Sequence, residues 1–150
     1  MRVVRTRGEN AAQVQPHGSL YVMAAKDENI AHAIADAVET FNVSIFGMAN
    51  TCHEKVYKNE RGLNFIAEFY ADLDYDENGK LVIAKGKNAK YDSKIATDRV
   101  LRALSEKKVT NTIGKDIDVG CDTICVHSDT PNAVEIIQGI RTALGKWKKF

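Results

Sequence analysis

The stretch "DTICVHSDTPNAVEIIQGIR", residues 122–141, decides the fold class because a strand, a turn and a helix follow one another within it. The apolar run 123–126 predicts a buried strand. Thr130 is a suitable N-cap, and Pro131 suits the first helical position, where its missing N–H costs nothing. Apolar residues then recur with helical spacing at Ala133, Val134, Ile136, Ile137, Ile140 and Leu144.

His127 stands directly after the predicted strand. In parallel α/β folds the turn after a strand lies at the carboxyl edge of the sheet, where ligands bind and catalytic side chains are displayed. A single histidine there can equally cap or fill the loop. A second arrangement of the same kind favours a functional interpretation, because Val14 begins an apolar strand that leads to His17, and Asp27 then precedes a predicted helix.

Carboxylates follow a third predicted strand, in "LNFIAEFYADLDYDENG", residues 63–79. Residues 65–67 are predicted to be buried, and Glu68, Tyr70 and Asp72 come directly after them. A strand that is buried on both faces rarely carries an unpaired carboxylate, since desolvating a lone charge is expensive. Glu68 is therefore a candidate site residue.

The remaining chain continues the alternation of strands and helices. A strand is predicted to end at Gly47, and helices are predicted in "TCHEKVYKN" and "SKIATDRVLRALSEKK", the second capped by Asp92 or Ser93. A hairpin is predicted around Gly114-Lys115. Four core strands alternating with four helices predict an α/β fold, a mostly parallel sheet or a segment of a barrel. No linker divides the chain, so residues 1–150 are predicted to form a single domain.

Composition and charge narrow the classes of function. The 150 residues are 44% hydrophobic and 27% charged, as in an ordinary globular protein. The 21 basic and 20 acidic side chains nearly balance, which gives no electrostatic reason to expect nucleic acid or an anionic membrane as a partner. No run approaches the roughly 18 apolar residues of a membrane-spanning helix, and "MRVVRTRGEN" lacks a signal-peptide core, so the chain is predicted to be cytoplasmic. The three cysteines include no C-x-x-C pair and are predicted to be reduced.

Three blocks carry a resemblance to a known family: "VQPHGSLY", "AEFYADLDYDENGKLV" and "DTICVHSDTPNAVEI". In order and spacing they resemble the signature blocks of the C-terminal portion of the LamB/YcsF family, which provides the A subunit of 5-oxoprolinase. The resemblance runs from about Val14 to Leu144. It implies a partial (β/α) barrel of the glycoside hydrolase/deacetylase type that lacks the family's N-terminal part. It also implies a role in ATP-dependent opening of the lactam 5-oxoproline to glutamate, together with two partner subunits.

Matching the blocks residue by residue gives a candidate site. The resemblance implies four catalytic residues, namely His17, Glu68, Asp72 and His127. It implies five substrate-binding residues, namely Gln15, Gly18, Tyr70, Asp129 and Thr130. The histidines suit proton transfer, because the unperturbed imidazole has a pKa of about 6.5. A carboxylate, either Glu68 or Asp72, is expected to orient one of them.

The chain also departs from the family pattern. Gln15 stands where the family has a lysine, and Leu73 stands where it has an arginine. Both changes remove a charge that could hold an anionic group. With the N-terminal blocks missing as well, the isolated chain is expected to need partners for activity. The uncovered strand edges of a partial barrel also predict a homo-oligomer.

Two alternative functions stay open. The residues at the strand ends could bind a divalent metal, as in a metal-dependent deacetylase-like hydrolase, although no H-x-x-x-H or H-x-E spacing supports this. The chain could instead be a degenerate or truncated binding or assembly subunit without catalytic activity. ATP use is implied by the family alone, because the sequence contains neither G-x-x-x-x-G-K-[ST] nor G-x-G-x-x-G. His32 and His53 are interpreted as ordinary helix residues, with His53 on a helix surface.

Overall fold

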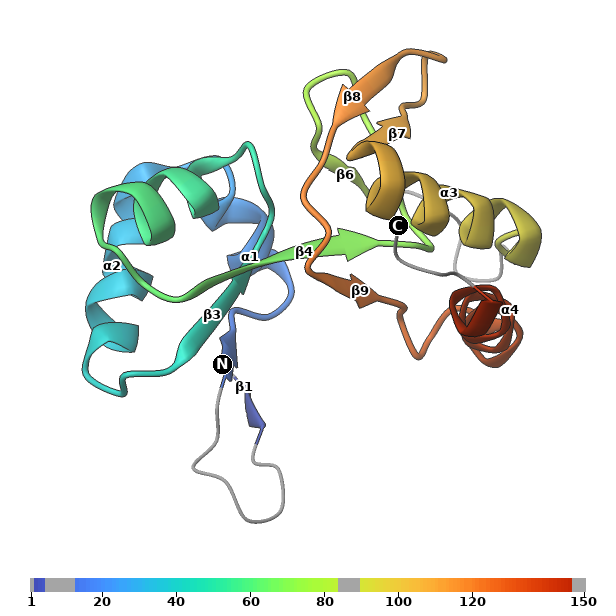
Figure 1. Cartoon of the computed structure of the whole chain (residues 1–150). Helices are drawn as coiled ribbons and strands as arrows, with labels where there is room; N and C mark the ends of the chain where they lie inside the picture. The colour runs from blue at the N-terminus through green and yellow to red at the C-terminus, as the bar shows by residue number, and fades with distance from the viewer. Residues whose placement is uncertain (1, 5–12, 84–89, 147–150) are drawn as a thin grey trace. The chain divides into compact units, whose positions relative to one another are not determined.

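Parallel strands form the centre of the first part of the chain. The computed structural model describes residues 2–4, 13–83 and 90–146 (Figure 1). These residues belong to two compact units, Met1–Glu68 and Phe69–Phe150. The boundary lies inside one strand, and each unit is described by itself below. The prediction of a single domain stays a prediction.

The first unit alternates strands with helices. Strand β2 pairs in parallel with β3, and β3 pairs in parallel with β4, with Val14 opposite Ile45 and Ile45 opposite Phe65. Strand β1 pairs with β2 in the antiparallel direction. The elements are β1 (Arg2–Val4), β2 (Gln13–Gln15), α1 (Ser19–Ala24), α2 (Glu28–Glu39), β3 (Ser44–Gly47), the π-helix η1 (Glu54–Glu60) and β4 (Phe65–Tyr70), whose last two residues lie in the second unit.

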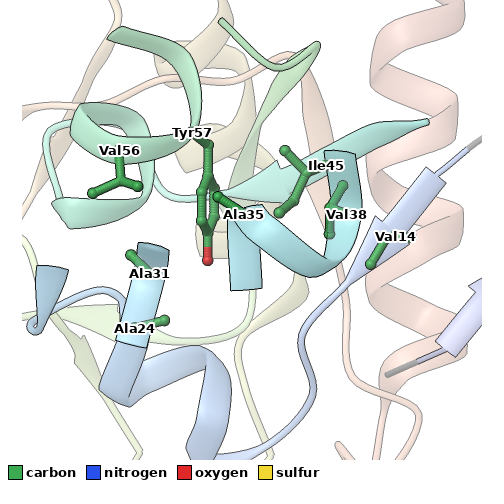
Figure 2. Close-up of a cluster of buried hydrophobic side chains, with 8 residues drawn as sticks. All are labelled: Val14, Ala24, Ala31, Ala35, Val38, Ile45, Val56 and Tyr57. Carbon is green, nitrogen blue, oxygen red and sulfur yellow. The ribbon is translucent and has the colours of Figure 1, made fainter. Parts of the chain in front are cut away.

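The core of this unit packs small helical residues against the sheet. Ala31, Ala35 and Val38 recur at intervals of four and three residues, so they share one face of α2, and all three are fully buried. They belong to a cluster that contains Val14, Ala24, Ala31, Ala35, Val38, Ile45, Val56 and Tyr57 (Figure 2). Helix α2 begins where predicted, because the Asp27 carboxylate accepts hydrogen bonds from the N–H groups of Asn29 and Ile30.

Gly47, the last residue of β3, is tightly enclosed. A Cβ atom there would lie 2.7 Å from Cε2 of Phe65 and 2.8 Å from Cβ of His53, closer than van der Waals contact allows. We expect Gly47→Ala to lower the free energy of unfolding by about 1–3 kcal/mol, the usual cost of overpacking a core. Gly145→Ala is the matched control, since no atom lies within 4 Å of its added Cβ and it stands in a helix. It should raise stability by about 0.5–1 kcal/mol. Equal urea midpoints for both variants would show that β3 can move away.

The second unit contains two hairpins and two long helices. Strands β5 and β6 pair in the antiparallel direction, as do β7 and β8, whose turn contains Gly114 at a φ of 77°. This confirms the predicted hairpin, and the Asp92 carboxylate confirms the predicted cap of α3 by accepting from the Lys94 and Ile95 N–H groups. The elements are β5 (Asp74–Tyr75), β6 (Leu81–Val82), α3 (Ser93–Glu106), β7 (Lys108–Thr110), β8 (Asp116–Asp118), β9 (Thr123–Cys125) and α4 (Ala133–Lys146).

The stretch 122–141 folds as a strand, a turn and a helix, but three details of the prediction are wrong. Helix α4 begins at Ala133, and the Thr130 hydroxyl donates to Asp72 rather than capping the helix. The predicted apolar face is only partly covered, since Ile136 is fully buried whereas Val134 is 68% exposed. Strand β9 is half-buried rather than buried. The Thr130 hydroxyl is thus engaged by a carboxylate from a distant segment of the chain.

Candidate active site

Asp72 organises a cluster of side chains in the second unit. It follows β4 by two residues, and its side chain is fully buried. Oδ2 accepts hydrogen bonds from the backbone N–H of His127 at 2.8 Å and from the Thr130 hydroxyl at 2.7 Å. Oδ1 lies 3.0 Å from Nδ1 of the His127 ring. The carboxylate therefore joins the end of β4 to the turn after β9.

The ionised form of Asp72 is favoured despite its burial. Burial by itself raises the pKa of a carboxyl group, but the hydrogen bonds from His127 and Thr130 outweigh it and lower the pKa of Asp72 below its ordinary value. A carboxylate accepts hydrogen bonds and does not donate them, so Nδ1 of a neutral His127 ring carries its proton toward Asp72. The lone pair then resides on Nε2, which is the nitrogen that can accept a proton.

His127 is held from a second side by an aromatic ring. The Tyr70 ring, from the end of β4, stacks on the imidazole with centroids 5.6 Å apart and planes inclined by 20°. The backbone N–H of Tyr70 donates to the Tyr75 hydroxyl at 2.9 Å, which ties this strand end to β5. The His127 side chain is 36% exposed. The ring is thus fixed in orientation by Asp72 and Tyr70 while part of it reaches solvent, as an acid–base residue requires.

The first unit contains a second polar pair. Nε2 of Gln15 donates to both carboxylate oxygens of Glu68, at 2.9 and 2.7 Å. Glu68 is only 7% exposed. A buried carboxylate needs a partner, as the sequence predicts, and the Gln15 amide is one. Gln15 lies at the end of β2 and Glu68 in β4. A neutral amide therefore pairs with the Glu68 carboxylate.

The other predicted site residues stand on exposed turns. In the first unit, His17 is exposed, and Gly18 precedes α1 as its N-cap with a φ of 61°, a left-handed conformation that suits glycine. In the second unit, Asp129 is exposed beside Thr130. The structure thus brings Tyr70, Asp72, His127 and Thr130 together in one unit and Gln15 with Glu68 in the other. Their roles in binding and catalysis stay predictions.

His53 departs most clearly from its predicted place. It is fully buried rather than exposed on a helix surface. Its Nδ1 accepts a hydrogen bond from the Met48 N–H at 3.1 Å, and its ring contacts Tyr21 and Tyr57 with centroids 4.6 and 5.3 Å away. Burial lowers the pKa of His53 to about 4. The signal that could have indicated this is the pair Val56-Tyr57, three and four residues on, which places His53 on the apolar face of the helical turn.

Metal-ligating side chains do not cluster in the described part of the chain. Among residues 13–83 and 90–145, no group of three or more histidine, cysteine, aspartate or glutamate side chains is arranged to hold a metal ion.

Among the described helices, none is long and apolar enough to cross a membrane.

Comparison with known proteins identifies the family. The sequence model of the LamB/YcsF family matches residues 1–148. The chain belongs to the LamB/YcsF family. This confirms the resemblance seen in the three blocks and extends it, because the match begins before Val14. Which portion of the full-length family members the chain corresponds to stays a prediction.

Curated LamB/YcsF relatives are longer than this chain. The A subunit of 5-oxoprolinase from Staphylococcus haemolyticus is 44% identical over 137 residues, which are 89% of this chain and 54% of the relative. The same subunit from Campylobacter jejuni is 37% identical over 145 residues, 95% of this chain and 56% of the relative. The chain therefore spans about half the length of the curated relatives it matches.

A solved structure confirms the fold class. The lactam utilization protein from Thermus thermophilus matches 90% of this chain and 54% of its own with a TM-score of 0.76 and 31% sequence identity. The predicted α/β fold with mostly parallel strands, of the type that LamB/YcsF proteins share, is thus confirmed.

Proposed function

We propose that this LamB/YcsF chain takes part in opening the lactam ring of 5-oxoproline, with His127 as the acid–base residue and Asp72 as the carboxylate that orients it. The observation that carries the proposal is the Asp72 cluster, in which one buried carboxylate accepts from the ring and the backbone of His127 and from Thr130. The names of the relatives, which refer to 5-oxoprolinase and to lactam utilization, supply the substrate class.

The proposed chemistry matches what a lactam requires. Water attacks the carbonyl carbon while Nε2 of His127 accepts a proton from it, and the Asp72 carboxylate stabilises the imidazolium that forms. The imidazolium then returns the proton to the ring nitrogen as the C–N bond breaks, which yields a free carboxylate and an amine. Proton transfer by a positioned residue typically contributes about 10²–10⁴-fold to the rate.

The remaining predicted site residues, from both units, are proposed to bind substrate or to assist. Gln15, Gly18, Tyr70, Asp129 and Thr130 are the proposed substrate contacts, and His17 and Glu68 are proposed as additional catalytic residues. ATP is proposed as a second substrate on the basis of the family resemblance. The glycine-rich phosphate-binding motifs are absent from the sequence, so the residues named here are assigned to the lactam and not to the nucleotide. A cytoplasmic location is proposed as well.

Partner subunits belong to the proposal because the relatives are named as one subunit of 5-oxoprolinase. We expect the chain alone to release no measurable glutamate from 5-oxoproline and ATP, because it spans about half of its relatives and has Gln15 and Leu73 in place of charged residues. Glutamate should appear only when partner subunits and the part of the relatives that this chain does not cover are both supplied. A self-assembled homo-oligomer is expected in all mixtures, and light scattering measures it.

The assay separates the candidate functions. Turnover by the chain alone would show that it is a complete catalyst. Absence of turnover in every mixture, with each component folded, would favour the non-catalytic assembly subunit. Turnover that chelators abolish and a divalent metal restores would favour the metal-dependent deacetylase-like hydrolase.

A further inference from the structure

Arg99 of α3 is a buried cation that the proposed chemistry does not use. Its side chain is only 12% exposed. Nη2 donates to the carbonyl of Leu73 at 2.7 Å, and Nη1 lies 3.1 Å from the Asp74 carboxylate. Both of these groups immediately follow Asp72 in the chain. The planar guanidinium therefore contacts two successive residues at once, the carbonyl of Leu73 and the carboxylate of Asp74. Lysine does not reproduce this geometry.

Aromatic rings complete the enclosure of Arg99. The guanidinium carbon lies 5.8 Å from the Tyr75 ring centroid and 5.4 Å from that of Tyr91, within the range of cation–π attraction. The Tyr91 hydroxyl donates to the same Asp74 oxygen that Arg99 contacts, at 2.9 Å. Nε of Arg99 is buried without a hydrogen-bond partner among the described residues. Burying the charge of Arg99 therefore costs free energy of desolvation. The other contacts of its side chain must offset this cost.

Two chains of contacts lead from Arg99 to His127. One passes through Leu73 and Asp74 to the neighbouring Asp72, whose carboxylate accepts from His127. The other passes through Tyr75, whose hydroxyl accepts from the N–H of Tyr70, and the Tyr70 ring stacks on His127. All of these residues belong to the second unit.

We propose that Arg99 is a positioning residue. It holds the segment 72–75 in place, so that the Asp72 carboxylate stays within hydrogen-bonding distance of His127. This inference rests on the proposed function for its consequence in catalysis, but the positioning itself can be measured without turnover. The burial of Arg99 lowers its own pKa, while the Asp74 and Asp72 carboxylates oppose that shift. The Asp72 carboxylate therefore favours the charged form of Arg99.

The test is the titration of the His127 ring, followed by NMR in the 150-residue chain and assigned by the signal that His127→Gln lacks. Arg99→Met keeps an apolar stem and removes the guanidinium. We expect the titration midpoint of His127 to fall by about 1 pH unit, because a displaced carboxylate stabilises the imidazolium less. Arg102→Met is the matched control on the same helix, since Arg102 pairs with Asp116 and Glu106 at the surface and should leave the midpoint unchanged.

The direction in which the His127 midpoint changes shows whether Arg99 acts by positioning Asp72 or through its own charge. Removing a positive charge can by itself only raise the midpoint of a nearby histidine. A raised or unchanged midpoint in folded Arg99→Met would therefore overturn the inference. If Arg99→Met does not fold, Arg99→Lys decides: it keeps the charge but not the planar fork, and its midpoint should also fall.

The inference and the proposed function fail in different ways. A lowered His127 midpoint in Arg99→Met, together with no turnover in any mixture, would overturn the function and support the positioning role. Loss of turnover in Asp72→Asn, together with an unchanged midpoint and rate in Arg99→Met, would overturn the positioning role and support the function.

Discussion

Asp72→Asn is expected to lower the rate of 5-oxoproline ring opening by about 10²–10⁴-fold, the contribution of a lost general acid or base. Oδ2 of Asp72 accepts from two donors, the His127 N–H and the Thr130 hydroxyl. An asparagine at this position must place its amide oxygen there, because a backbone N–H can only donate. Its NH₂ group then faces Nδ1 of His127, and the neutral ring must move its proton to Nε2. The nitrogen that accepts the proton of water is thereby blocked.

The measurements for this variant are the rate of glutamate release in the mixture that supports turnover and the tautomer of His127. Nitrogen chemical shifts of the His127 ring report the tautomer without any need for activity. Asp76→Asn is the matched control, because Asp76 accepts turn hydrogen bonds from Asn78 and Lys80 N–H groups that an asparagine oxygen can also accept. A His127 ring that keeps its proton on Nδ1 in the Asp72→Asn variant would contradict the assignment. So would a rate in Asp72→Asn equal to that of the control.

A loss of stability between about pH 6.5 and 4 is the expected consequence of burying His53. Burial lowers the pKa of His53 from 6.5 to about 4 in the folded chain. Between these values the unfolded chain binds a proton that the folded chain does not, so acid favours unfolding. The stabilisation is fully present above pH 6.5 and is lost as the pH falls through the folded pKa. A shift of this size corresponds to about 3 kcal/mol.

The variant His53→Asn isolates this contribution. The asparagine oxygen can accept from the Met48 N–H as Nδ1 of His53 does, but it does not titrate. Urea unfolding at several pH values should therefore show a smaller loss of stability between about pH 6.5 and 4 in His53→Asn than in the unsubstituted chain. His32→Gln is the matched substitution at a histidine on the surface, which lies beside Glu60. An identical pH dependence in His53→Asn would mean that His53 does not stay neutral when folded.

Features set by neighbouring residues could be predicted from the sequence. The start of α2 after Asp27, the cap at Asp92 and the turn at Gly114 depend on hydrogen bonds and backbone angles within a few residues, and all three are confirmed. The family could be predicted as well, because three ordered blocks carry it. The candidate residues at the strand ends follow from the same local pattern, since a turn after a strand is visible in the order of the residues.

Only the tertiary structure decided which of these side chains meet. Asp72 and Thr130 are 58 positions apart, and Gln15 and Glu68 are 53 apart. The hydroxyl of Thr130 had two possible partners, the N–H groups in the first turn of α4 and the distant Asp72 carboxylate. The Thr130-Pro131 pattern in the sequence favours the first. The carboxylate accepts it because a buried charge gains more from a hydrogen bond than a helix end that water can solvate. His53 is buried for a related reason, since the packing of η1 against α2 determines which face of a helical turn is covered.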